Sequence, residues 1–268
     1  MIRKEKYEPE KYKQAVPFGM GVQWFVDLNC DMGEGIGNDD AIMPFISSAN
    51  IACGYHAGDE ETIKRTVELC MKYNVAIGAH PSFDDRKNFG RTDIHLPASE
   101  IHDIVTKQIH LVSEIAKQLG TSLHHVKPHG ALYNMAAKDE ELAATIAKAI
   151  KDVDEKLILY GLSGSYSIAK AKEIGLMIAN EVFADRTYQD DGSLTSRSKP
   201  DALIEDEERS LQQVLQMIKG KTVTGLTGKI IPINADTVCI HGDGKHAVEF
   251  AKRIHETLKS QNIVIQTI

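Results

Sequence analysis

Ionisable side chains gather at the ends of short apolar runs in this sequence, and within each run they occupy alternate positions. Asp27, Asn29 and Asp31 alternate with apolar residues in the first run, and Lys127 and His129 flank a proline in a later one. Successive side chains of a β-strand point to opposite faces, so each set shares one face. Carboxylates, imidazoles and an ammonium group in one place can transfer protons and stabilise developing negative charge. The pattern therefore predicts an enzyme site built at the ends of strands.

Seven such runs must position these groups, and their order along the chain predicts the fold. The runs are Val26–Glu34, Ala49–Asp59, Val75–Asp85, His124–Tyr133, Leu157–Ser165, Ala179–Arg186 and Thr237–Gly244. Helical segments are expected between and after them, at Asp59–Tyr73, Pro97–Leu119, Asp139–Ile150, Ser165–Glu173, Asp201–Ile218 and Gly244–Ser260. Strands that alternate with helices run parallel to their neighbours. Polar groups at the carboxyl ends of such strands are typical of a barrel's active site, so we expect an α/β fold with a seven-stranded parallel β/α barrel.

Two segments lie outside this alternation. Residues 1–23 carry no core pattern, so we expect an N-terminal extension followed by a single catalytic barrel domain over residues 24–268. Lys221–Thr224 and Lys229–Ile233, joined through Gly225 to Gly228, are typical of a small inserted hairpin.

Composition excludes several classes of function. A net charge of -7 without a long basic stretch argues against nucleic-acid binding. No apolar run approaches the roughly 20 residues that span a membrane, and the charged N-terminus lacks a secretory signal, so we expect no membrane partner and a cytoplasmic protein. The four cysteines form no C-x-x-C pair, which indicates buried thiols. Gly220-Lys221-Thr222 lacks the spacing of a phosphate-binding loop.

Four histidines, His56, His80, His129 and His241, each follow a different apolar run. A lone histidine beside a strand is usually structural, but four that converge on one rim of a barrel favour acid–base function. In the first run, Asp31 lies nearest the strand end and is the expected catalytic carboxylate.

The remaining buried charges have alternative roles. Asp27 lies deeper than Asp31 and is expected to pair with a buried cation. Lys127 can stabilise an oxyanion or a phosphate, and the alternative is a buried ion pair with Asp27 or Glu181. Arg91, Arg186 and Arg197 offer guanidinium groups for a carboxylate or phosphate, with Arg186 the best placed.

A tightly bound metal ion is not expected from the spacing of these residues. The first run is not followed by an H-x-H pair, which is one of the usual spacings of metal-binding histidines. If a metal ion binds, the expected ligands are Asp31, His56 and His80, because carboxylates and imidazoles at strand ends can hold a divalent ion.

Six strings between Val26 and the C-terminus are specific enough to compare with known families. They read DLNCDMGE, SANIACGYHAGD, GAHPSF, KPHGALYN, EVFADRTY and CIHGD. In this order and spacing they closely resemble the LamB/YcsF family. The resemblance implies a seven-stranded β/α barrel similar to that of glycoside hydrolases and deacetylases, in agreement with the seven runs counted above.

The same resemblance implies an activity, a cofactor and partners. The activity is cleavage of the lactam of 5-oxo-L-proline to L-glutamate, coupled to hydrolysis of ATP, with Mg²⁺ as its counter-ion, to ADP and phosphate. The partners are the B and C subunits of a 5-oxoprolinase. An unstrained lactam is a poor electrophile, so phosphorylation of its carbonyl oxygen would create a centre that water can attack. The missing nucleotide loop leaves open whether ATP binds at an unfamiliar site in this chain or on the partner subunits.

Matching the family's strings position by position gives the candidate site. The expected catalytic residues are Asp31, His56, His80, Lys127 and His129. The expected substrate-binding residues are Asn29, Glu34, Arg91, Tyr133, Glu181, Asp185, Arg186, His241 and Asp243. We hypothesise that Asp31 with His56 or His80 deprotonates the water, that Lys127 and His129 stabilise charge on the lactam, and that Arg186 holds the substrate carboxylate. One departure is Thr92, which stands where the family has a second arginine after Arg91.

Two other functions stay open at this stage. One is a stand-alone metal-dependent deacetylase or amidase that acts on an N-acyl compound. The other is a non-catalytic subunit that presents 5-oxoproline to its partners.

Overall fold

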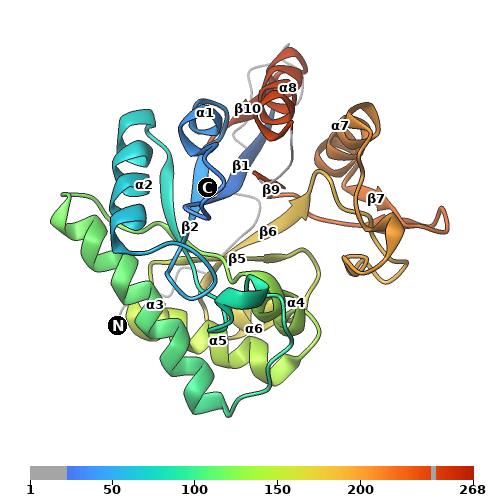
Figure 1. The fold of residues 1–268 in the computed structure, drawn as a ribbon. Helices are drawn as coiled ribbons and strands as arrows, with labels where there is room; N and C mark the ends of the chain where they lie inside the picture. Colours follow the sequence, from blue (N-terminus) through green and yellow to red (C-terminus); the bar gives the residue numbers. More distant parts are fainter. Residues whose placement is uncertain (1–22, 243–245) are drawn as a thin grey trace, which may run out of the picture.

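The computed structural model describes residues 23–242 and 246–268, so nearly all of the expected N-terminal extension, and Asp243, lie outside the described residues. Within these residues, seven parallel strands form a closed barrel (Figure 1). The strands are β1 (Trp24–Met32), β2 (Ser48–Ala52), β3 (Ala76–His80), β4 (His125–Val126), β5 (Ile158–Leu162), β6 (Met177–Phe183) and β9 (Thr237–Ile240). Each strand pairs with the next in chain order, and β9 pairs with both β6 and β1, which closes the barrel. The predicted fold class is confirmed.

Helices cover the outside of the barrel and follow the strands in the expected alternation (Figure 1). They are α1 (Asp39–Ile42), α2 (Glu60–Tyr73), α3 (Ala98–Gln118), α4 (Gly130–Ala136), α5 (Glu140–Val153), α6 (Tyr166–Glu173), α7 (Glu207–Leu215) and α8 (Ala247–Ser260). Short helical turns lie at Met43–Phe45, Arg86–Asn88, Pro200–Ala202 and Gln216–Gly220. A last strand, β10 (Ile263–Ile265), pairs in parallel with the start of β1.

Local capping explains where several helices begin. The Asp59 side chain accepts the Thr62 amide at the start of α2, and the Asp139 side chain accepts the amides of Glu141 and Leu142 at the start of α5. Each carboxylate satisfies amides that lack a partner in the first turn and complements the helix dipole.

Two expected boundaries were wrong. The helix expected from Asp201 begins only at Glu207, because the Asp206 side chain accepts the Arg209 amide and fixes the first turn there. The fourth strand was expected to alternate through His129, but β4 ends at Val126 and α4 starts at Gly130. Pro128 has no amide hydrogen to donate to a strand ladder, which favours an early end of the strand.

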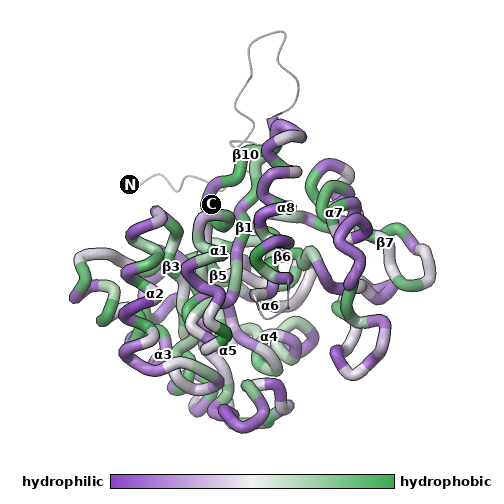
Figure 2. The backbone as a smooth tube through the Cα atoms, turned by 45° about the horizontal axis from the view of Figure 1, so that its top comes forward, coloured by the Kyte–Doolittle hydropathy of each residue, from purple (hydrophilic) through white to green (hydrophobic). Residues whose placement is uncertain are grey.

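The expected hairpin is present as β7 (Thr222–Thr224) and β8 (Ile230–Pro232), which pair antiparallel outside the barrel. Apolar residues of the strands and of the inner helix faces form the core, and Figure 2 shows helices such as α2 and α3 alternating between hydrophilic and hydrophobic colours along their length. Among the described residues, no helix combines the length and the apolar composition that crossing a bilayer requires.

Candidate active site

A pocket opens at the carboxyl ends of the strands, where the sequence predicted the site. It encloses about 550 Å³, including solvent at its mouth. Asp31, His80, Lys127 and His129 line it together with Arg186. These residues come from or directly follow β1, β3, β4 and β6, so the parallel strands deliver them to one rim.

Lys127 is the centre of a buried ion network in this pocket. Its Nζ lies 2.9 Å from Asp31 Oδ1, 2.8 Å from Glu181 Oε1 and 3.2 Å from Asn29 Oδ1. Burial by itself lowers the pKa of Lys127, but the carboxylates of Asp31 and Glu181 outweigh burial and hold that pKa well above its ordinary value. Lys127 therefore stays charged and can donate to a developing oxyanion.

Asp31 is held ionised by its neighbours. Asn50 Nδ2 donates to its Oδ1 over 2.8 Å, and His80 Nε2 lies 3.3 Å from its Oδ2. Burial raises the pKa of Asp31, but its interactions with His80 and Lys127 outweigh burial and keep the pKa of this carboxyl well below its ordinary value. A buried, ionised carboxylate beside an imidazole is a suitable pair to orient water and accept its proton.

Three of the four predicted histidines pack against one another beside the pocket. The rings of His56 and His129 stack with centroids 3.8 Å apart, and His80 meets His129 edge-on at 4.8 Å. Burial lowers the pKa of His56 to about 3 and holds the pKa of His129 well below its ordinary value. Glu34 lines the pocket and also contacts this cluster, with Oε1 3.1 Å from His56 Nε2.

His241 lies apart from this histidine cluster but lines the same pocket. Its Nδ1 lies 2.7 Å from Asp185 Oδ1, and Arg197 donates to its Nε2 over 2.8 Å. Burial raises the pKa of Asp185, but the neighbouring His241, with Arg197 and Arg186, outweighs burial and keeps that pKa below its ordinary value. This chain of contacts makes one side of the pocket cationic.

Arg186 and Arg91, the residues that the sequence offers for a substrate anion, both line the pocket. Arg186 is buried, and its guanidinium donates hydrogen bonds to the backbone carbonyls of Ala202 and Thr195. Burial and then the charge of Arg197 lower the pKa of Arg186 to about 10, so it stays charged at neutral pH.

The expectation for Asp27 was wrong. No cation contacts it among the described residues; its carboxylate accepts hydroxyl hydrogen bonds from Ser47, Ser48 and Thr237, at 2.6 to 2.7 Å. Burial is the largest influence on the pKa of Asp27 and raises it, while the hydrogen bonds from the three hydroxyl groups act in the opposite direction.

Most of the predicted site residues, Tyr133 included, line this pocket. Those lining it are Asp31, Glu34, His80, Arg91, Lys127, His129, Tyr133, Arg186 and His241. Asn29, Glu181, His56 and Asp185 contact these residues from behind. Sequence reasoning missed Asn50 and Ser82. Asn50 could have been found, because a polar residue stands in the middle of an apolar run.

These features define a class of protein: a parallel β/α barrel whose strand ends carry acid–base groups, a buried lysine and arginines around one polar pocket. The chain belongs to the LamB/YcsF family, whose family model matches residues 26–268.

Curated relatives extend over nearly the whole chain. A protein of Tolumonas auensis, named as the A subunit of 5-oxoprolinase, is 52% identical over 248 residues, which cover 91% of this chain and 99% of that protein. A Bacillus cereus protein of the same name is 50% identical and covers 90% of this chain and 98% of its own length.

Solved structures agree with this assignment. The crystal structure of a lactam utilization protein from Thermus thermophilus superposes with a TM-score of 0.85 at 39% identity, covering 91% of this chain and all of that one. A mutant of a CE4-family pseudoenzyme gives a TM-score of 0.51 at 14% identity over 92% of this chain and 66% of that one, a likeness that concerns the fold alone.

Proposed function

We propose that this chain is the A subunit of a 5-oxoprolinase, which opens the lactam of 5-oxo-L-proline to L-glutamate with hydrolysis of ATP. The relatives of that name, identical at about half of the aligned positions, support the proposal. The geometric observation that carries it is the Lys127 ammonium group, held between Asp31 and Glu181 at the floor of a pocket lined by arginines.

The pocket offers each group that lactam cleavage needs. Ring opening consumes one water molecule, which adds to the carbonyl carbon while the ring nitrogen leaves as an amine. Hydrolysis of ATP consumes a second water molecule. Asp31, whose Oδ2 lies 3.3 Å from His80 Nε2, is placed to orient the attacking water and take its proton. Lys127 and His129 would stabilise negative charge on the carbonyl oxygen of the lactam, or on a phosphate transferred to that oxygen.

Substrate binding is assigned to the cationic side of the pocket. Arg186 is charged and buried, so it would hold the 5-oxoproline carboxylate in a site of low dielectric. Arg91, Tyr133 and His241 would complete the binding surface. The full reaction takes ATP, with Mg²⁺ as its counter-ion, in a complex with the B and C subunits, and we place it in the cytoplasm.

The test is reconstitution of the chain with its B and C subunits. We expect glutamate to form from 5-oxoproline only when all three subunits and ATP are present. Glutamate formation that does not need this chain would contradict the proposal.

Two controls separate the other functions that the sequence left open. Release of acetate from N-acetyl compounds by the isolated chain, abolished by a chelator and indifferent to ATP, would favour a stand-alone deacetylase. Binding of 5-oxoproline by the isolated chain in calorimetry, with turnover of the complex unchanged by Asp31→Asn, would favour a binding-only subunit.

A further inference from the structure

Four side chains beside the pocket bring their ligand atoms into one small space. Glu34, His56, His80 and His129 each offer one nitrogen or oxygen, and these four atoms lie within 4.8 Å of one another. The three histidines are fully buried or nearly so. Because each atom can accept a hydrogen bond, the donor and acceptor state of each ring decides what can occupy the space between them.

Backbone carbonyls fix the state of two rings. His80 Nδ1 lies 2.7 Å from the carbonyl oxygen of Lys127, and His129 Nε2 lies 2.9 Å from that of Phe89. A carbonyl only accepts, so each of these nitrogens carries the hydrogen. In a neutral imidazole the other nitrogen then bears a lone pair. When both rings are neutral, His80 Nε2 and His129 Nδ1 turn their lone pairs towards each other, at a separation of 2.9 Å.

The third ring is fixed in the same way by a side chain. The Ser82 hydroxyl donates to the carbonyl of Phe83 over 2.9 Å, so it accepts from His56 Nδ1, which lies 3.0 Å away. The lone pair of His56 Nε2 then faces Glu34 Oε1 at 3.1 Å. Outward hydrogen bonds that orient a ring and leave the inner nitrogen free are the usual support of metal-binding histidines.

Lone pairs that face one another repel unless a cation lies between them. We propose that Glu34, His56, His80 and His129 bind one first-row divalent metal ion, with zinc the ion that best suits three imidazoles and a carboxylate. Four of the six separations between these atoms run from 2.9 to 4.0 Å, and all six are within 4.8 Å. They bracket the separation of about 3.4 Å between two ligands of a tetrahedral ion with bonds near 2.05 Å.

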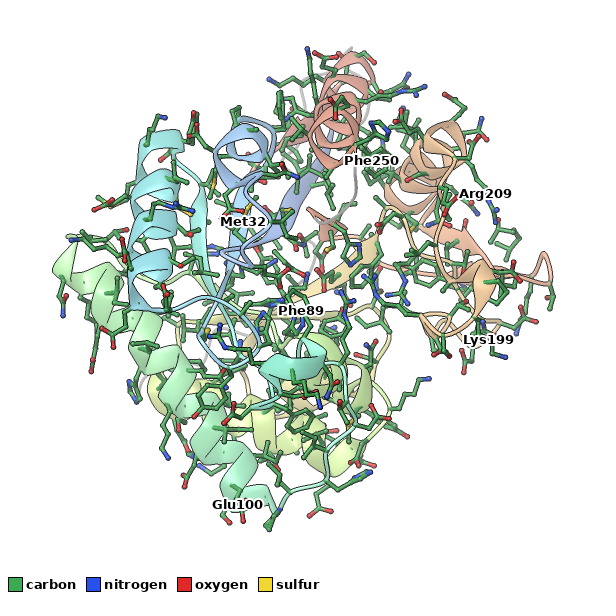
Figure 3. All side chains as sticks on the ribbon, viewed as in Figure 1. Met32, Phe89, Glu100, Lys199, Arg209 and Phe250 are labelled. Atoms are coloured by element: carbon green, nitrogen blue, oxygen red, sulfur yellow. The ribbon has the colours of Figure 1, made fainter. Side chains whose placement is uncertain are left out.

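The surrounding backbone is shaped around this cluster. Phe89, labelled near the centre of Figure 3, adopts a left-handed conformation with φ of 57°, which is strained for a residue with a side chain. Its carbonyl orients His129, and its ring meets His56 edge-on. Next to it, a Cβ on Gly90 would lie 2.9 Å from the His129 ring. Strain of this kind persists where the surrounding structure requires it, as at a ligand site.

This inference departs from the expectation drawn from the sequence, which favoured no tightly bound metal and named Asp31, His56 and His80 as the ligands of any ion. The structure keeps two of those residues and adds Glu34 and His129. Asp31, which lines the pocket, has its Oδ2 3.3 Å from His80 Nε2. A metal site here does not depend on the proposed function.

The test uses the full-length chain without an affinity tag, stripped of metal and titrated with Zn²⁺ alone or Co²⁺ alone. We expect one ion per chain by elemental analysis after dialysis, and a visible Co²⁺ absorption typical of nitrogen and oxygen ligands. Glu34→Gln and His129→Gln are expected to lower the affinity at least 100-fold. Ser82→Ala, which removes only the hydroxyl that orients His56, is expected to lower it about 10-fold or more.

The matched control is His110→Gln on the exposed face of α3, which should bind metal like the unaltered chain. Circular dichroism checks that each variant is folded. If Glu34→Gln or His129→Gln does not fold, the affinity of the Ser82→Ala variant still tests the proposal. The proposal is overturned if the unaltered chain retains no ion after dialysis, or if folded Glu34→Gln, His129→Gln and Ser82→Ala variants all bind as tightly as the control.

Discussion

Lys127 Nζ lies 2.9 Å from Asp31 Oδ1, although the two residues are 96 positions apart in the sequence; Asp31 lies in β1, and Lys127 directly follows β4. Glu181 lies on the other side of the same ammonium group, at 2.8 Å. One buried cation thus holds two carboxylates at the floor of the pocket, and both stability and chemistry depend on it.

Removing this cation should destabilise the protein strongly. Lys127→Met keeps much of the volume but leaves two buried carboxylates without a counter-charge, so we expect the free energy of unfolding to fall by about 3–5 kcal/mol in urea titrations. Lys148→Met is the control, because Lys148 forms an exposed ion pair with Asp152 and should change stability by less than about 0.5 kcal/mol. Equal losses in the free energy of unfolding for the two variants would show that Lys127 does not balance two buried carboxylates.

A glycine in β3 should tolerate no side chain. A Cβ on Gly78 would lie 2.1 Å from Nε2 of the buried His125, in the strand beside it. We expect Gly78→Ala to lower stability by about 3 kcal/mol through overpacking. At Gly220 the nearest atom would be 3.5 Å away, so Gly220→Ala should change stability by no more than about 0.5 kcal/mol in the same thermal or urea measurement. A Gly78→Ala variant as stable as the unaltered chain would show that the strands pack differently.

The Asp185–His241 contact should give a pH-dependent contribution to stability. The pKa of Asp185 is lowered in the folded chain, so its contribution is fully present above the unfolded pKa near 4 and is lost as pH falls through the folded pKa. We expect Asp185→Asn to cost about 1–2 kcal/mol at pH 7, and less as the pH falls below about 5. Urea unfolding across this range measures the difference, and a cost that grows on acidification would have the wrong sign.

Arg186 should control substrate affinity more than rate. Arg186→Lys keeps the charge but loses the planar fork that pairs with a carboxylate, so we expect KM for 5-oxoproline to rise about tenfold or more with little change in kcat. Arg209→Lys is the control, because Arg209 lies exposed on α7 at the edge of the molecule (Figure 3). A loss of kcat at unchanged KM would place Arg186 elsewhere in the reaction.

The sequence predicted the barrel because period-two alternation and helical stripes are local signals that survive folding. The same alternation placed Asn29 and Asp31 on the inner face correctly, and Lys127 reaches both. It did not predict that hydroxyl groups would satisfy Asp27, because those partners come from two other strands and their connections.

The histidines show the same limit. Their convergence followed from strand ends, and His56, His80 and His129 do meet. The orientations of the His129 and His56 rings depend on the Phe89 carbonyl and the Ser82 hydroxyl, which lie in loops whose path no periodic pattern encodes. His241 pairs with Asp185 and Arg197 instead, since β9 lies beside β6 and not beside β3.

Glutamate release from 5-oxoproline by the reconstituted three-subunit complex measures directly whether Asp31 and Lys127 take part in the reaction. Asp31→Asn preserves size and removes the charge, and Lys127→Ala removes the ammonium group; we predict that each lowers the rate at least about 100-fold in a complex that still assembles. Near wild-type rates in both variants would contradict the account, because the reaction would then proceed without the two groups that the barrel brings together.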